Sequence, residues 1–210
     1  MLTPALVPRP LWGRSVYNRL PRKQWESLRR TVLEVAANTC THCAEQYDSH
    51  MVCHEVWTYD DVKHVATLTA FEIVCRDCDS VLHLGKSLLI GAKKHDEGSA
   101  ERGDQAVKQL MKVSGITKRQ ANTLIDDAFG RWMDRSKHKT WAVKIARELI
   151  ERHPVLASLT LRPRQAGMPV LLFSSFKTSC FMLNILSSKK KDRQECLSYW
   201  RSLLNDVHGC

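Results

Sequence analysis

Apolar residues recur at helical spacing in separate stretches of the chain. Between residues 24 and 37 they occupy one face and arginines another, which predicts an amphipathic helix. The same spacing resumes from residue 104, where Ser114-Gly115 marks a turn and Thr117 suits the N-cap of the next helix. We expect these two helices either to pack as a helical hairpin or to form a helix-turn-helix that reads DNA.

Other stretches alternate with a period of two, which is typical of strands. Residues 51–59 and 66–75 read as two strands that pair as a hairpin, and residues 141–145 as a short third strand followed by a helix that ends at His153-Pro154. A short helix is expected from Asp79, and an exposed loop over residues 93–103. The fold class predicted is α+β, mostly helical, with a small ββα module that carries the hairpin.

Composition divides the chain into four parts. Residues 1–22 contain four prolines and predict an extended N-terminal arm whose Leu11, Trp12 and Tyr17 dock onto the body. We expect the ββα module over residues 23–92 and the helical hairpin region over residues 104–155, packed on the module. Residues 163–210 form a basic C-terminal extension whose role the sequence does not reveal.

Two C-x-x-C pairs carry the clearest chemical signal. Cys40 and Cys43 are separated from Cys75 and Cys78 by 31 residues, and four such thiolates can surround one structural Zn²⁺ ion tetrahedrally. The alternative is four buried free cysteines. Cys53 lies inside a strand and, like three cysteines of the C-terminal extension, has no C-x-x-C partner, so we expect ordinary thiols there.

Histidine and acidic residues gather next to these cysteines. His54 and Glu55 follow Cys53 on the first strand, and Asp79 and His83 follow the last cysteine of the second pair. Together they could hold a catalytic Mg²⁺ or Mn²⁺ beside a general base, as metal-assisted phosphodiester hydrolysis requires. Each has a purely structural alternative: His54 as partner of a buried carbonyl, Asp79 as a helix N-cap and His83 as a helix-face residue.

Charge and hydropathy narrow the class of partner. The formal net charge is +10, which favours a polyanion, and we expect DNA, with RNA as the alternative, and no small-molecule cofactor. The expected phosphate-contacting cations are Arg22, Lys23, Arg29, Arg30, Lys86, Lys93 and Lys94. No stretch reaches the roughly 18 to 20 apolar residues of a membrane span, so we expect no membrane partner and a cytoplasmic protein of a bacterium or phage. The oligomeric state is not readable from the sequence.

The segment from residue 38 to 87 resembles the HNH endonuclease superfamily, whose ββα-metal fold is often braced by two zinc knuckles. The run Cys53-His54-Glu55-Val56-Trp57-x-Tyr59-Asp60-Asp61 is similar to the C-H-E-V-W-x-Y-D-D signature of one bacterial branch, and His83-Leu84-Gly85 to its closing H-x-G. The resemblance implies that His54 and Glu55 share the roles of general base and metal ligand, in either order. The family pattern places Asn where this chain has Ala70, and His where it has Asp79.

Two functions follow from this resemblance. The first is an endonuclease that hydrolyses DNA with a divalent metal ion held near His54, Asp79 and His83. The second is a catalytically decayed module that binds nucleic acid and keeps the zinc knuckles only as a scaffold. The replacements at Ala70 and Asp79 favour the second function, because in the family the Asn orients the catalytic His.

Overall fold

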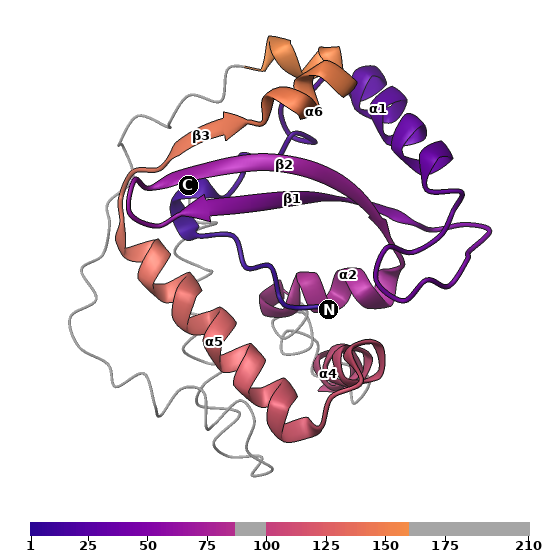
Figure 1. The fold of residues 1–210 in the computed structure, drawn as a ribbon, viewed down its shortest axis with the longest axis vertical. Helices are drawn as coiled ribbons and strands as arrows, with labels where there is room; N and C mark the ends of the chain where they lie inside the picture. The colour runs from indigo at the N-terminus through magenta and orange to yellow at the C-terminus, as the bar shows by residue number, and fades with distance from the viewer. Residues whose placement is uncertain (87–99, 160–210) are drawn as a thin grey trace.

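A small three-stranded sheet lies at the centre of the fold, seen here in a computed structural model that describes residues 1–86 and 100–159 (Figure 1). Strands β1 (Val52–Asp60) and β2 (Val65–Val74) form an antiparallel hairpin, and β3 (Ala142–Ile145) pairs parallel to β2. The strand order is β1-β2-β3, so β1 is an edge strand. Helix α2 (Arg76–Leu82) follows β2 directly, which confirms the α+β class and a small ββα-like module.

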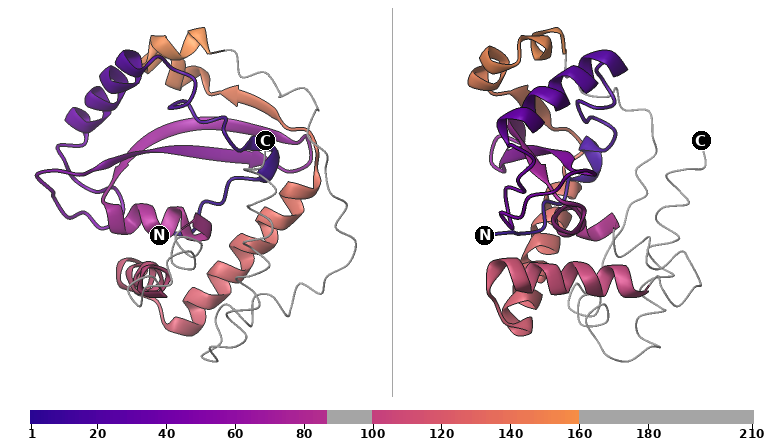
Figure 2. Two further views of the ribbon diagram at one scale, coloured as in Figure 1. Left: turned by 180° about the vertical axis from the view of Figure 1, so that it is seen from behind. Right: turned by 90° about the vertical axis from the view of Figure 1, so that its right-hand side faces the viewer.

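Helices cover the sheet on two sides. Helices α1 (Arg22–Val35) and α6 (Arg147–Arg152) lie on one side, and α2, α4 (Ala100–Ser114) and α5 (Lys118–Lys137) on the other (Figures 1 and 2). Trp25 and Leu28 are the buried residues of α1, and the Trp25 ring meets Phe71 of β2 edge to face at 6.2 Å. The predicted helix and strands therefore form where expected, with bounds that differ by one or two residues.

The N-terminal arm is part of the core. Leu2 and Val16 are fully buried, and the indole nitrogens of Trp12 and Trp132 both donate to the carbonyl oxygen of Val7. A short 3₁₀ turn, Arg9–Leu11, breaks the extended course after Pro8. Tyr17 contacts the body through an edge-to-face contact of its ring with Trp25 at 5.7 Å, although 63% of this residue stays exposed.

The helical hairpin packs on the ββα module. Gly115 adopts φ +63° between α4 and α5, which a residue without Cβ does at little cost, and Thr117 then caps α5 in a complete capping box with Gln120. Helix α4 packs on α2, as expected of a packed hairpin. The prediction of a loop over residues 93–103 is wrong for residues 100–103, which already belong to α4. Ala, Glu and Arg at residues 100–102 are good helix formers.

The chain ends its described course in a short helical segment. Helix α6 stops at Arg152 before His153-Pro154, as predicted, and a 3₁₀ turn, Pro154–Ser158, buries Leu156. Within residues 1–86 and 100–159, no helix combines the length and apolar character that crossing a membrane demands. The predicted C-terminal extension, and Lys93 and Lys94, lie outside the described residues.

We expect Thr117→Ala to lower the free energy of unfolding by about 1 kcal/mol, because the backbone amide of Gln120 loses the hydroxyl that accepts from it. Chemical denaturation of the whole protein measures this loss. Thr123→Ala is the matched control, since Thr123 is exposed inside α5 and alanine is the better helix former. An equal loss in both variants would contradict the capping role.

Candidate metal centres and the cleft beside them

The four knuckle cysteines converge, as predicted from their spacing. The Sγ atoms of Cys40, Cys43, Cys75 and Cys78 lie within 4.8 Å of one another, and those of Cys43 and Cys75 are 3.9 Å apart. A tetrahedral ion with Zn–S bonds of about 2.3 Å has sulfurs about 3.8 Å apart, whereas a disulfide needs about 2 Å. The cluster therefore fits a metal ion such as zinc, and the thiols are free of disulfides.

Backbone geometry prepares these sulfurs as acceptors. The amide of Cys75 donates to Cys40 Sγ at 3.3 Å, and the amide of Cys78 donates to Cys75 Sγ at 3.4 Å. Burial raises the pKa of Cys40, but hydrogen bonds from backbone amides outweigh it and lower the pKa to about 7. Burial raises the pKa of Cys43 and Cys78. At least one sulfur is thus disposed to be a thiolate, the form that binds metal.

Gln109 was missed by the sequence reasoning. Its amide nitrogen, on α4, donates to Cys78 Sγ at 3.4 Å and so ties the helical hairpin to the cysteine cluster. Only the tertiary packing of α4 on α2 brings it there. By contrast, Cys53 stays outside the cluster, buried with a pKa that burial raises to about 12, as expected of an ordinary thiol. Cys180, Cys196 and Cys210 lie outside the described residues.

A second group of candidate ligands forms where β1 meets α2. Helix α2 begins at Arg76, so the prediction that it starts at Asp79 is wrong by three residues. The alternative role of Asp79 as N-cap is also wrong, because the Cys75 sulfur accepts the cap hydrogen bond from the amide of Cys78. Asp79 and His83 are consequently one helical turn apart on the same face. One ligand atom each from His54, Asp79 and His83 lies within 4.8 Å of the other two.

Asp79 Oδ1 occupies the middle of this group. It is 3.6 Å from His54 Nδ1 and 3.6 Å from His83 Nε2, too far for a hydrogen bond to either. The oxygen is nonetheless buried, and no hydrogen-bond partner for it exists among residues 1–86 and 100–159. Since a buried carboxylate oxygen is costly without a partner, the gap between the three side chains fits a cation.

The donor set indicates which cation suits the gap. Two imidazoles and one carboxylate favour a first-row transition ion such as Mn²⁺ over Mg²⁺, which prefers oxygen ligands. Burial lowers the pKa of His83, so its ring is neutral near pH 7 and can offer a lone pair. The rings of His54 and His83 meet at 4.9 Å between centroids, which orients both.

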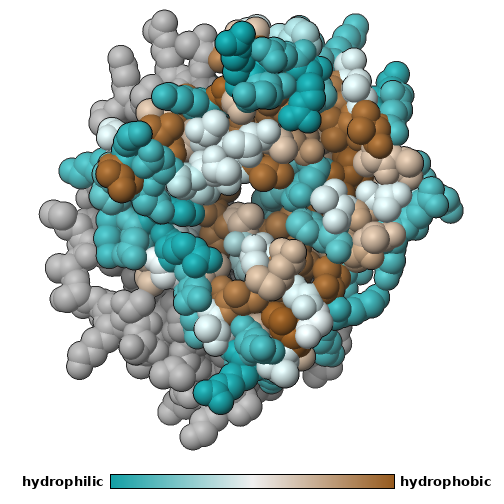
Figure 3. All heavy atoms as spheres, in the orientation of Figure 1, coloured by the Kyte–Doolittle hydropathy of each residue, from teal (hydrophilic) through white to brown (hydrophobic). Residues whose placement is uncertain are grey.

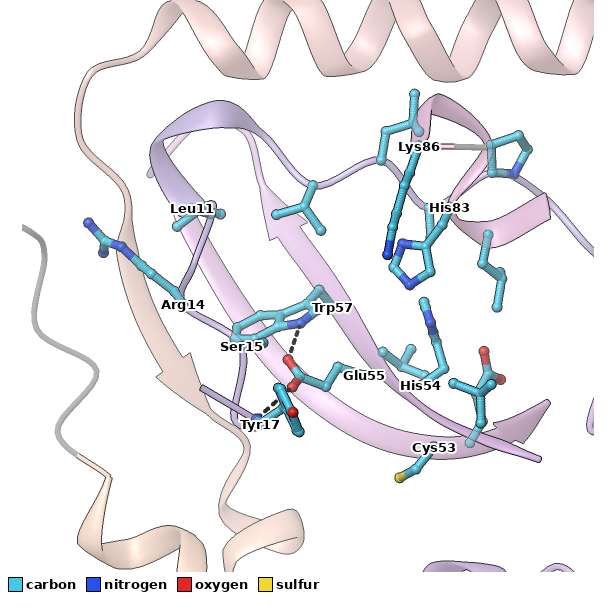
Figure 4. A pocket seen from close by; sticks show the side chains of 18 of the residues that line it. Leu11, Arg14, Ser15, Tyr17, Cys53, His54, Glu55, Trp57, His83 and Lys86 are labelled. Carbon is cyan, nitrogen blue, oxygen red and sulfur yellow. Dashed lines mark hydrogen bonds between the residues drawn. The ribbon is translucent and has the colours of Figure 1, made fainter. Parts of the chain in front are cut away.

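Glu55 is not part of this group. Its Oε1 accepts from the amides of Val16, at 2.7 Å, and Tyr17, at 3.4 Å, and its Oε2 accepts from Trp57 Nε1 at 3.1 Å. Figure 4 shows the carboxylate beside Trp57 and Tyr17, while His54 and His83 lie together elsewhere in the same cleft. Burial raises the pKa of Glu55 above its usual range. Glu55 therefore holds the N-terminal arm against β1.

A cleft of about 1110 Å³ runs beside β1 and contains His54, Glu55 and His83 in its walls. The N-terminal arm forms one wall and α5 contributes to another, and Figure 3 shows this face hollowed near its centre. Among residues 1–86 and 100–159, five cations line the cleft: Arg14, Arg29, Lys86, Arg131 and Arg135. The cleft thus places positive charge around the candidate ligands.

The predicted nucleic-acid contacts divide between cleft and surface. Arg29 and Lys86 line the cleft, whereas Arg22, Lys23 and Arg30 are exposed on α1 and do not. Arg131 and Arg135 were missed, although their four-residue spacing in a predicted helix indicates a shared face. Arg135 binds Asp61 through two nitrogens at 2.7 and 2.9 Å and covers the Tyr59 ring.

His42 and His64 are two further histidines of the module. His42, inside the first knuckle, is half-buried and pairs with Glu72 at 3.1 Å. His64 lies in the hairpin turn at φ +50°, with its ring 3.7 Å from that of His138. Neither belongs to a ligand group among the described residues.

We expect the purified protein to contain one zinc ion per chain and Cys75→Ser to lose it. The melting temperature should fall by about 10 °C or more. Metal binding contributes several kcal/mol to the free energy of unfolding, and each kcal/mol shifts Tm by roughly 2–4 °C at this chain length. Elemental analysis and calorimetry measure the two effects. The Cys53→Ser variant should keep the zinc ion, and loss of zinc from this variant would contradict the four-cysteine site.

We expect Asp79→Ala to weaken Mn²⁺ binding at least about tenfold, because the central carboxylate between two imidazoles is gone. Titration calorimetry on zinc-loaded protein measures this. Asp77→Ala, two residues earlier and exposed on the same helix, should bind Mn²⁺ as the unmodified protein does. Equal affinity in all three proteins would show that the ion, if bound, lies elsewhere.

Comparisons with known proteins add no relative to this picture. No family model, no curated protein and no solved structure matches the chain. The likeness to HNH endonucleases consequently stands on the motif residues and on two structural facts, a small ββα-like fold and a four-cysteine cluster that could bind zinc.

Proposed function

We propose that this protein is an HNH-like endonuclease that hydrolyses phosphodiester bonds of DNA with the help of a divalent metal ion. One observation carries the proposal: a buried carboxylate oxygen of Asp79, without a hydrogen-bond partner among the described residues, lies between the nitrogens of His54 and His83, and these two histidines line a cleft that also contains cations. Structural burial alone gives no reason for two imidazoles to face an oxygen that they do not hydrogen-bond. A cation site gives that reason.

The chain's own groups divide the work as follows. His54, Asp79 and His83 would hold the ion, which when bound stabilises negative charge on the scissile phosphate. The motif leaves the roles of metal ligand and general base open between His54 and Glu55. In this proposal His54 is the ligand and Glu55 is the base. A carboxylate offers about four lone pairs, and three hydrogen bonds to Glu55 leave one on Oε2 to accept a proton from water.

Charge supports DNA as the substrate. Lys86 and Arg131 are both exposed and both line the cleft, and the net charge of +10 attracts a polyanion over a longer range. Figure 4 shows the Lys86 side chain running alongside His83. A phosphate next to the His54 group would therefore have a lysine within reach.

A specific observation favours a second candidate, a decayed module that binds nucleic acid without cleaving it. Ala70, at the position of the family's Asn, offers no side-chain hydrogen bond to orient a histidine. In this chain the contact between the His54 and His83 rings supplies an orientation instead. The two candidates differ in whether that contact suffices for catalysis.

We expect the zinc-loaded protein to nick supercoiled plasmid and to cut a single-stranded oligonucleotide when Mn²⁺ is added. His54→Ala and Glu55→Gln should each lower the rate roughly 100-fold or more, as losses of a ligand and of a base. Gel electrophoresis of the products measures the rates. His138→Ala, an exposed histidine outside the cleft, should keep full activity.

The decayed module gives a different pattern. All four proteins would then shift both DNA substrates in a gel without cutting them, and the shift would weaken with salt. Cleavage that survives in His54→Ala would instead point to a contaminating nuclease.

A further inference from the structure

The His54 group is recessed, and this limits which form of nucleic acid can reach it. His54 is only 7% exposed, and the central oxygen of Asp79 is buried. A duplex presents its phosphates on a stiff convex cylinder, so it meets the rim of a cleft more readily than its floor. An unpaired strand is flexible enough to follow a groove and bring one phosphate inside.

The cleft wall formed by the N-terminal arm is fixed in place. Val16 is fully buried, and the amides of Val16 and Tyr17 donate to Glu55 on the edge strand β1. Ala5 adds a backbone hydrogen bond to Leu82 of α2 at 3.0 Å. The arm therefore stays across the approach to β1, and a rigid duplex has to contact it before reaching His54.

Aromatic side chains line the cleft together with the cations. Trp12, Trp57 and Tyr17 all contribute to its walls, and Tyr17 is the most open of them, with 63% of its surface exposed. Its backbone is held by Glu55 while its ring extends into the cleft region (Figure 4). An exposed aromatic on a fixed backbone, next to cations, is the arrangement that binds unpaired bases by stacking.

We propose that the cleft binds an unpaired stretch of DNA, with a base stacked against Tyr17 and phosphates next to Arg131 and Lys86. This inference deepens the proposed function, because it specifies single-stranded or locally melted DNA as the substrate. Whether the bound strand is cleaved rests on the proposed function. The volume of about 1110 Å³ exceeds that of a typical small-molecule site, as several nucleotides of one strand require.

Fluorescence anisotropy of the full chain tests the proposal without cleavage, in buffer without added Mn²⁺. The probes are a labelled 12-nucleotide single strand that cannot fold on itself and the blunt duplex of the same sequence. We expect the single strand to bind at least about fivefold more tightly than the duplex. Tyr17→Ala should weaken single-strand binding roughly tenfold, whereas Tyr17→Phe keeps the ring and should retain the affinity.

Cations provide a matched pair of variants. Arg131→Ala should weaken binding of the single strand several-fold, and Lys139→Ala, exposed but outside the cleft, should not. Circular dichroism of each variant identifies any that fail to fold. If Tyr17→Ala fails to fold, the pair Arg131→Ala and Lys139→Ala still tests binding of the strand in the cleft.

The outcomes separate this inference from the proposed function. Duplex binding equal to or tighter than single-strand binding, or a Tyr17→Ala variant that binds normally, overturns the inference even if plasmid is cut. Preferential, Tyr17-dependent binding of the single strand without cleavage of any substrate supports the inference and removes hydrolysis from the proposed function.

Discussion

The convergence of four cysteine sulfurs is the constraint on which the rest of the module depends. It joins the turn after α1 to the turn between β2 and α2, which are more than 30 residues apart in the chain. The same contact determines where α2 begins, because the Cys75 sulfur is the N-cap of that helix. Once α2 begins at Arg76, Asp79 and His83 lie one turn apart and face His54.

The helical hairpin and the arm reinforce this geometry from two directions. Helix α4 packs on α2 and donates a hydrogen bond from Gln109 to Cys78, so the helix that carries Asp79 is held on its outer side. The arm is held by Glu55 at one end and by Leu82 near the other. A cleft with fixed walls results, and fixed walls hold the candidate ligands in one arrangement.

Sequence patterns predicted the elements and the two ligand groups, because each rests on local spacing. The C-x-x-C pairs, the alternation of the hairpin and the N-cap at Thr117 all act over a few residues. What the patterns missed depends on tertiary contacts. The start of α2 depends on a sulfur cap, Gln109 on the docking of α4, and the exposure of Tyr17 on how the arm crosses β1.

Glu55 has a structural role that its place in the motif did not reveal. Adjacency to His54 in a motif suggested that one of the two binds the ion and the other acts as the base beside it, yet neighbouring residues of a strand point in different directions. In the structure His54 accordingly faces Asp79 of α2, whereas Glu55 accepts hydrogen bonds from amides of the arm. In the proposed function Glu55 would be the base and would also hold the cleft wall. Removing its hydrogen bonds would loosen the approach to His54, so loss of its charge alone and loss of the whole carboxylate should differ in their effects.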